Sequence, residues 1–299
     1  MTRRDETLGG LLVGSASILF GSVVIFGRYA LAEGVGVPSM LAVRFGVGAA
    51  ILAVALVLTR RPLVAAAGER GGLAILAVCG YAVEASFFFA AVRHGTAAAV
   101  TLLFFTYPVF VTLATWVLGR GAPAGMTILA LACAVVGSAV VVGFGAGLVI
   151  EPIGAALAVA AALTYTGYLI GADIVLKRTH PMTSAMWVSG GASLGLFAYA
   201  GAVGEWVLPS TWDAWWPLLG MGVATSGAFV CLLAGLQRLG AVRTSIVAAT
   251  EPLSTALLAF VFLDESVALA TIVGGALILV GAVIATLARA PTAREQQIP

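Results

Sequence analysis

Residues 123–144 read PAGMTILALACAVVGSAVVVGF, a run that contains no Asp, Glu, Lys or Arg. An α-helix needs about 20 apolar residues to cross the hydrocarbon core of a bilayer, because each residue adds about 1.5 Å of length. The run therefore predicts a transmembrane helix. The whole chain has the same character, since 61% of its residues are hydrophobic and only 9% are charged. Soluble domains carry about 25% charged residues, so the composition indicates an integral membrane protein.

Similar apolar runs lie on both sides of this segment, separated by charged residues, proline and glycine. The first begins at Leu8 and is longer than the core of a secretory signal peptide, so we expect it to remain as a span. The sequence predicts an all-α polytopic membrane protein with ten transmembrane helices. The expected spans are approximately 8–27, 37–58, 71–92, 96–118, 123–144, 152–175, 182–203, 213–236, 241–263 and 267–288.

The basic residues are distributed unequally between the two sides of these spans. If the N-terminus is cytoplasmic, only Arg28 and Arg93 fall in outer segments, while Arg44 lies within a span. Cytoplasmic loops of membrane proteins are enriched in Lys and Arg. We therefore predict a multi-pass membrane protein with both termini in the cytoplasm. The inner segments contain Arg3, Arg4, Arg60, Arg61, Arg70, Arg120, Lys177, Arg178, Arg238, Arg243, Arg289 and Arg294.

The two halves of the chain resemble one another. A shift of 144 positions aligns the fourth and fifth spans with the ninth and tenth, with identities that include Thr106/Thr250, Pro108/Pro252 and Gly137/Gly281. Each half then holds five spans, and an odd number makes the second half enter the membrane from the opposite face. We predict two inverted five-helix repeats, residues 1–147 and 148–299, around a central cavity, as in many secondary transporters.

A longer motif in the second half, with a weaker copy in the first, resembles that of a known family. Residues 236–252 read LQRLGAVRTSIVAATEP, and FLDE follows at 262–265. This pattern resembles the EamA repeat of the drug/metabolite transporter superfamily. The first half has a weaker version, with VRHG at 92–95 and TYP at 106–108, and it has Gly121 where the family places an acidic residue.

The resemblance implies a basket-like ten-helix fold with a central cavity lined mainly by spans 1, 3, 4, 6, 8 and 9. Members of the superfamily move amino acids, nucleotide sugars, triose phosphates or drug-like solutes. The ten-span form is similar to bacterial exporters of metabolites and amino acids, including aromatic amino acids, which implies a location in the bacterial inner (plasma) membrane.

Several motifs of other protein classes are missing from the sequence. It has no G-x-x-x-x-G-K-[ST] loop for ATP and no H-E-x-x-H or paired-aspartate metal motif. It also has no recognisable nucleophile with a base. We expect no enzymatic activity, no cofactor, no metal and no ATP or nucleic acid as partner. The expected partners are a small-molecule substrate and the lipid bilayer, and the sequence leaves the oligomeric state open.

Charged residues at membrane depth are costly and usually functional. Glu84 lies near the middle of the third span and Glu251 near the middle of the ninth. Glu84 has two possible roles, a transport site or a structural ion pair with Arg44. Pro108 and Pro252 each remove a helical N–H, so both predict kinks, which act either in gating or as static bends.

Aromatic residues at helical spacing surround these carboxylates. The third span places Tyr81, Glu84 and Phe88 on one face. Such a stripe is either packing or the wall of a binding site, and the resemblance favours the site because it places these spans around the cavity. The predicted cavity residues are Tyr81, Glu84, Phe88, Phe104, Tyr107, Tyr165, Tyr168, Phe229 and Glu251.

These observations favour a secondary transporter that exports small organic metabolites, such as aromatic or apolar amino acids, by alternating access. A nucleotide-sugar or sugar-phosphate exchanger is an alternative, although only Arg44 and the two outer arginines would be near its anionic substrate. A membrane-embedded lipid-processing enzyme or flippase is the alternative from another class.

Overall fold

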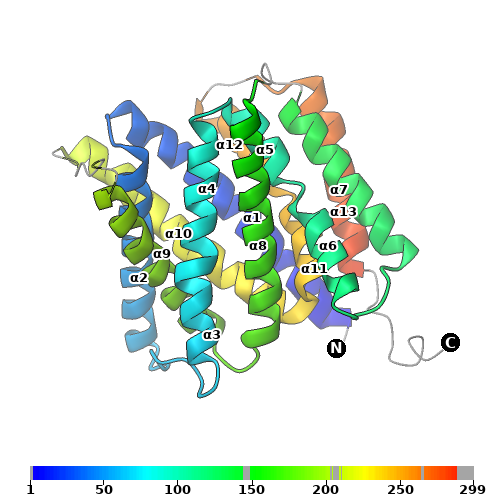
Figure 1. Ribbon diagram of the computed structural model, residues 1–299, viewed down its shortest axis with the longest axis horizontal. Helices are drawn as coiled ribbons and strands as arrows, with labels where there is room; N and C mark the ends of the chain where they lie inside the picture. The colour runs from blue at the N-terminus through cyan, green and yellow to red at the C-terminus, as the bar shows by residue number, and fades with distance from the viewer. Residues whose placement is uncertain are drawn as a thin grey trace.

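The fold consists of helices that stand side by side (Figure 1). It is seen in a computed structural model that describes residues 3–143, 149–202, 204, 209, 211–263 and 266–287. The predicted boundary between the halves, at 147/148, lies outside these residues, as do Arg289 and Arg294. The helices are α1 (Arg3–Ala32), α2 (Val37–Leu58), α3 (Arg70–Ile75), the π-helical η1 (Leu76–Ala82), α4 (Val83–Val92), α5 (Ala97–Phe104), α6 (Tyr107–Val117), α7 (Gly125–Gly143), α8 (Pro152–Val175), α9 (Pro181–Ala202), α10 (Trp212–Leu239), α11 (Ala241–Ala248), α12 (Glu251–Leu263) and α13 (Leu269–Leu287).

These elements form ten rods, which confirms the predicted all-helical fold. Three rods are composite: α3, η1 and α4 form one, α5 and α6 another, and α11 and α12 a third. Within the described ranges, nine rods are long and apolar enough to span a membrane. The tenth is α9, which has 22 residues but buries Thr183, Ser184, Ser189 and Ser193. Its polar face packs against α2 and η1. These buried polar residues lower its hydropathy, although the helix is part of the bundle (Figure 1).

The predicted kinks are present in both halves. Thr106 lies in the break between α5 and α6, and Thr250 in the break between α11 and α12. Each hydroxyl donates to the carbonyl three residues earlier, on Leu103 at 2.6 Å and on Val247 at 2.8 Å. The same two carbonyls also accept the backbone N–H groups of Thr106 and Thr250, so the side chains reinforce the turn at each break. The repeated sequence therefore gives a repeated helix break.

A two-fold relation between the halves follows from the contact between α7 and α13, which lie side by side (Figure 1). A Cβ added at Gly137 would lie 2.6 Å from the carbonyl oxygen of Gly274, and one at Gly281 would lie 2.7 Å from that of Ala130. The shift of 144 maps the first contact onto the second. Because the register runs in opposite directions, the helices are antiparallel and the two-fold axis is perpendicular to them. The halves are therefore inverted, as predicted.

The start of each half packs against the other half. We call the α4–α5 side of the bundle the upper end and the α8–α9 side the lower end, as they lie in Figure 1. At the upper end, His94 hydrogen-bonds Glu151 at 3.0 Å, beside an antiparallel bridge between Gly95 and Ile150. At the lower end, Arg243 forms an ion pair with Glu6 at 3.0 Å. The start of each repeat is therefore joined to the other repeat by a polar contact.

Candidate transport cavity

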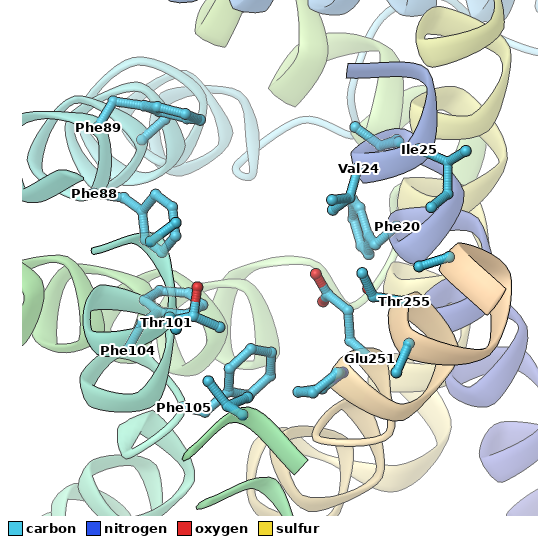
Figure 2. Close-up of a pocket in the computed structure, with 18 of the residues that line it drawn as sticks. Phe20, Val24, Ile25, Phe88, Phe89, Thr101, Phe104, Phe105, Glu251 and Thr255 are labelled. Atoms are coloured by element: carbon cyan, nitrogen blue, oxygen red, sulfur yellow. The ribbon is translucent and has the colours of Figure 1, made fainter. Parts of the chain in front are cut away.

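A cavity of about 500 Å³ lies between helices of both halves (Figure 2). This volume is within the range of about 300–1,000 Å³ that is usual for small-molecule sites. The cavity begins near midspan, at Tyr107 and Tyr165, and reaches the upper end at Arg28 and Ala97. Its wall takes side chains from α1, α2, η1, α4, α5, α6, α7, α8 and α12.

The contribution of α10, the eighth span, differs from the expectation. None of its described residues lines the cavity. Its Phe229 is fully buried behind Tyr81, with ring centroids 4.9 Å apart. Tyr168 of α8 also lies behind Tyr81, at 5.7 Å between centroids, and is 1% exposed. Both rings support the wall instead of forming it, because Tyr81 stands between them and the open space.

The other predicted aromatic residues meet at the cavity. Tyr81, Phe88, Phe104, Tyr107 and Tyr165 all line it. The rings of Phe88 and Phe104 are 5.4 Å apart, and those of Tyr107 and Tyr165 are 4.8 Å apart, both edge-to-face. Such edge-to-face pairs are favourable and hold the rings in place. Their part in substrate binding remains a prediction.

Both predicted carboxylates line the same cavity. Glu84, on the first turn of α4, is 6% exposed, and Glu251 begins α12 just after the helix break. Figure 2 shows the carboxylate of Glu251 directed into the space between α1 and α5. Pro252 lines the cavity beside it, whereas Pro108 lies in the wall behind. One of the two predicted gating prolines therefore borders the open space.

Arg44 is the proposed structural partner of Glu84, but no such pair is formed in the described part of the chain. No carboxylate oxygen lies within 4.0 Å of its guanidinium there. Its guanidinium carbon lies 4.3 Å from the ring centroid of Phe45, a cation–π contact. Its Nε is buried without a hydrogen-bond partner, and the side chain lines the cavity.

Sequence reasoning missed several residues of the wall. Phe20 of α1, Phe89 of α4 and Phe105 after α5 add three rings, and Thr101 and Thr255 add hydroxyls (Figure 2). Phe20 and Val24 are four residues apart on α1, so helical spacing could have found them. An apolar face gives no sign by itself of whether it meets a cavity or a neighbouring helix.

The lower end of the bundle is held by charged groups. Asp173 pairs with Lys177 at 3.2 Å and with Arg120. The carboxylate of Glu69 accepts hydrogen bonds from the N–H groups of Lys177, Arg178 and Thr179, and from the Thr179 hydroxyl. Burial raises the pKa of Glu69, but these hydrogen bonds outweigh it and keep the pKa below its usual 4.5. The described residues contain no cluster of His, Cys, Asp and Glu that could hold a metal.

Comparison with known proteins agrees with this architecture. The model of the EamA-like transporter family matches residues 7–143 and 152–287. An uncharacterized transporter of Synechocystis is 28% identical over 178 residues, which cover 57% of this chain and 53% of that protein. The matched part thus spans about half the length of that relative. An uncharacterized transporter of Archaeoglobus fulgidus is 28% identical over 214 residues, 70% of this chain and 74% of that protein.

A solved crystal structure shares the fold, with a TM-score of 0.76 and 20% identity over 97% of this chain and 99% of the other. The two family matches together cover most of the sequence and coincide with the two inverted halves. The chain therefore belongs to the EamA-like transporter family, within the drug/metabolite transporter superfamily, and is a multi-pass membrane protein.

Proposed function

We propose that the protein is a secondary transporter that exports small organic metabolites, in particular aromatic or apolar amino acids, across a bacterial inner membrane. The supporting observation is one aromatic-walled cavity of about 500 Å³, between inverted repeats, that holds both Glu84 and Glu251. Aromatic walls suit an apolar solute, and a few convergent polar groups fix its orientation. Export is the direction that the resemblance to bacterial exporters implies.

Alternating access is the mechanism that this arrangement favours. The cavity extends toward the upper end, and ion pairs join the helices at the lower end. The breaks before Pro108 and Pro252 lie beside the cavity in both halves. A broken helix lets its two parts tilt separately, so these breaks suit a gating role. With both termini cytoplasmic, as the basic residues predict, the cavity would face the periplasm in this conformation.

A sugar-phosphate or nucleotide-sugar substrate fits the cavity less well. Such a substrate carries at least one phosphate, and the cavity offers Arg28 and Arg44 against two carboxylates. Each carboxylate in an apolar setting would repel the phosphate, at a cost that the low dielectric increases. The charges therefore favour a substrate that carries an ammonium group.

Transport by the purified protein in liposomes tests the proposal. Vesicles loaded with a panel of amino acids should release aromatic and large apolar ones faster than protein-free vesicles do. The same assay with and without a pH gradient would show whether protons are coupled. Release of none of the panel, together with release of sugar phosphates, would contradict the proposal.

A further inference from the structure

The charged side chains Arg44, Glu84 and Glu251 form no direct ion pair with one another, an observation that bears on the substrate of the proposed function. Arg44, Glu84 and Glu251 line one space. In the part of the chain that the structure describes, no hydrogen bond or ion pair of these side chains is found at the distances that define one. Buried charges are normally paired or hydrogen-bonded. A ligand bound in the cavity would supply the missing hydrogen-bond partners.

Arg44 is the group that restricts the ligand most. Its Nε–H is buried without an acceptor, and the aromatic ring of Phe45 lies against the guanidinium. A ring face supports the positive charge but accepts no in-plane N–H group. The two terminal nitrogens, unlike Nε, are not buried, so a planar acceptor in the cavity can reach them. A carboxylate meets that geometry because it accepts two parallel hydrogen bonds from arginine. The ligand should therefore bring a carboxylate to Arg44.

Glu84 and Glu251 require a ligand group of the opposite charge, one that is positive and donates hydrogen bonds. A carboxylate only accepts hydrogen bonds when ionised, and both stand in a wall that is otherwise mostly aromatic and aliphatic. The carboxylate of Glu251 points into the open space (Figure 2). An ammonium group supplies up to three donors and a compensating charge. The same ligand should therefore carry an ammonium group.

We infer that the cavity recognises the zwitterionic head of an α-amino acid, with Arg44 binding its carboxylate and Glu84 and Glu251 binding its ammonium. The side chain of the amino acid then packs against Phe88 and Phe104, whose rings line the same space. An organic amine would leave Arg44 without a partner. An organic anion would meet two carboxylates. Arg44 is thus a specificity-determining residue that selects amino acids over amines of the same shape.

Three solutes with the same benzyl group test this inference: L-phenylalanine, phenethylamine, which lacks the carboxylate, and 3-phenylpropionate, which lacks the ammonium. Binding is measured on the full-length protein in detergent by ligand-induced thermal stabilisation, and transport in liposomes by competition. The unmutated protein should bind phenylalanine about tenfold to a hundredfold more tightly than either analogue, as expected for one lost charge-assisted interaction.

Arg44→Gln should remove the preference for phenylalanine over phenethylamine and keep the preference over 3-phenylpropionate. Arg44→Lys should recover part of the preference for phenylalanine over phenethylamine, because lysine restores the positive charge but not the planar guanidinium group. Arg61→Gln is the matched control, because Arg61 is an exposed arginine of the α2–α3 connection, outside the cavity, and its loss should change neither ratio.

The results separate this inference from the proposed function. Phenylalanine that binds with the expected preference but is not transported would contradict the transport proposal alone. Equal binding of phenylalanine and phenethylamine by the unmutated protein would overturn the inference, even if Arg44→Gln fails to fold. An unchanged ratio in a folded Arg44→Gln protein would overturn it as well.

Discussion

Glu69 should stabilise the bundle more than any single surface charge, because one carboxylate joins the two halves. It precedes α3 in the first half, and its partners, residues 177–179, follow α8 in the second. The Oε1 atom accepts from the N–H groups of Lys177 and Arg178 at 3.1 and 2.8 Å. The Oε2 atom accepts from the N–H of Thr179 at 2.9 Å and from its hydroxyl. Glu69→Ala removes all four bonds.

The cost of this change can be worked from the exposure of the donors. A hydrogen bond to a charged group contributes about 1.5–3 kcal/mol, but these four share one acceptor and are not additive. Lys177 and Arg178 are exposed, so water can replace the carboxylate there, while Thr179 is buried. We therefore expect a loss of about 2–4 kcal/mol, mainly from the buried donors. At about 2 °C per kcal/mol for a large chain, the apparent Tm should fall by about 4–8 °C.

Thermal unfolding in detergent, followed by the loss of the monodisperse peak in size-exclusion chromatography, measures this shift. Glu151→Ala is the matched control at the opposite end of the bundle. Its carboxylate is 66% exposed and pairs with a half-exposed His94, so its removal should cost at most about 1 kcal/mol. A Tm for Glu69→Ala no lower than that of Glu151→Ala would refute the reasoning.

The low pKa of Glu69 adds a pH signature. Since the folded state holds this pKa below its usual 4.5, the ionised carboxylate contributes its stability fully above pH 4.5. The contribution is lost as the pH falls through the folded-state pKa. The Tm difference between the unmutated protein and Glu69→Gln should therefore be constant near neutral pH and shrink below pH 4.5. A difference that grows on acidification would contradict this assignment.

Three further predictions concern the interface of the halves, the transport site and the topology. Gly137→Leu places a side chain against the backbone of Gly274, so folded yield should fall by an overpacking cost of about 1–3 kcal/mol or more; Gly14→Leu, where a Cβ meets nothing within 4 Å, is the control, and equal yields would contradict the close packing. Glu84→Gln should give an inserted, folded protein with impaired transport or an altered pH profile of transport; normal transport with an unchanged profile would refute a functional role, while loss of expression would favour a structural one. A reporter enzyme that functions only in the cytoplasm should be active when fused after Arg289, and one that functions only in the periplasm should be inactive. Activity of the periplasmic reporter would overturn the predicted orientation.

Much of the fold could be predicted from the sequence because hydrophobic length determines membrane helices almost directly. The inverted relation also followed from simple counting, since an odd number of spans reverses the second half. The kinks before Pro108 and Pro252 were predictable because proline lacks the N–H that a helix requires. The π-helical turn η1 was not, although it positions Tyr81. Its sequence, LAVCGYA, is an ordinary apolar run, and the extra residue per turn shows only in the packed structure.

The cavity was harder to predict than the helices that form it. Spacing identified the face of the third span that carries Tyr81, Glu84 and Phe88, and all three line the cavity. Spacing could not show that Tyr168 and Phe229 stand one layer behind Tyr81. A buried aromatic ring and a cavity ring have the same sequence signature, because both avoid lipid and water. The distinction depends on the distances between helices, which many small residues set together.

The repeat gives the two ends of the bundle equivalent backbone positions, but the residues there make the ends unequal. The shift of 144 relates Tyr29, near the end of α1, to Asp173, near the end of α8. Tyr29 donates one hydrogen bond, 2.9 Å long, to the carbonyl of Phe262 in the last turn of α12. Asp173 instead binds Arg120, just beyond α6, and Lys177. The ion pair with Arg120 joins α8 to the chain just beyond α6, whereas Lys177 directly follows α8 and adds no contact between helices. At these two equivalent positions the ion pair lies at the lower end and the neutral hydrogen bond at the upper end, toward which the cavity extends.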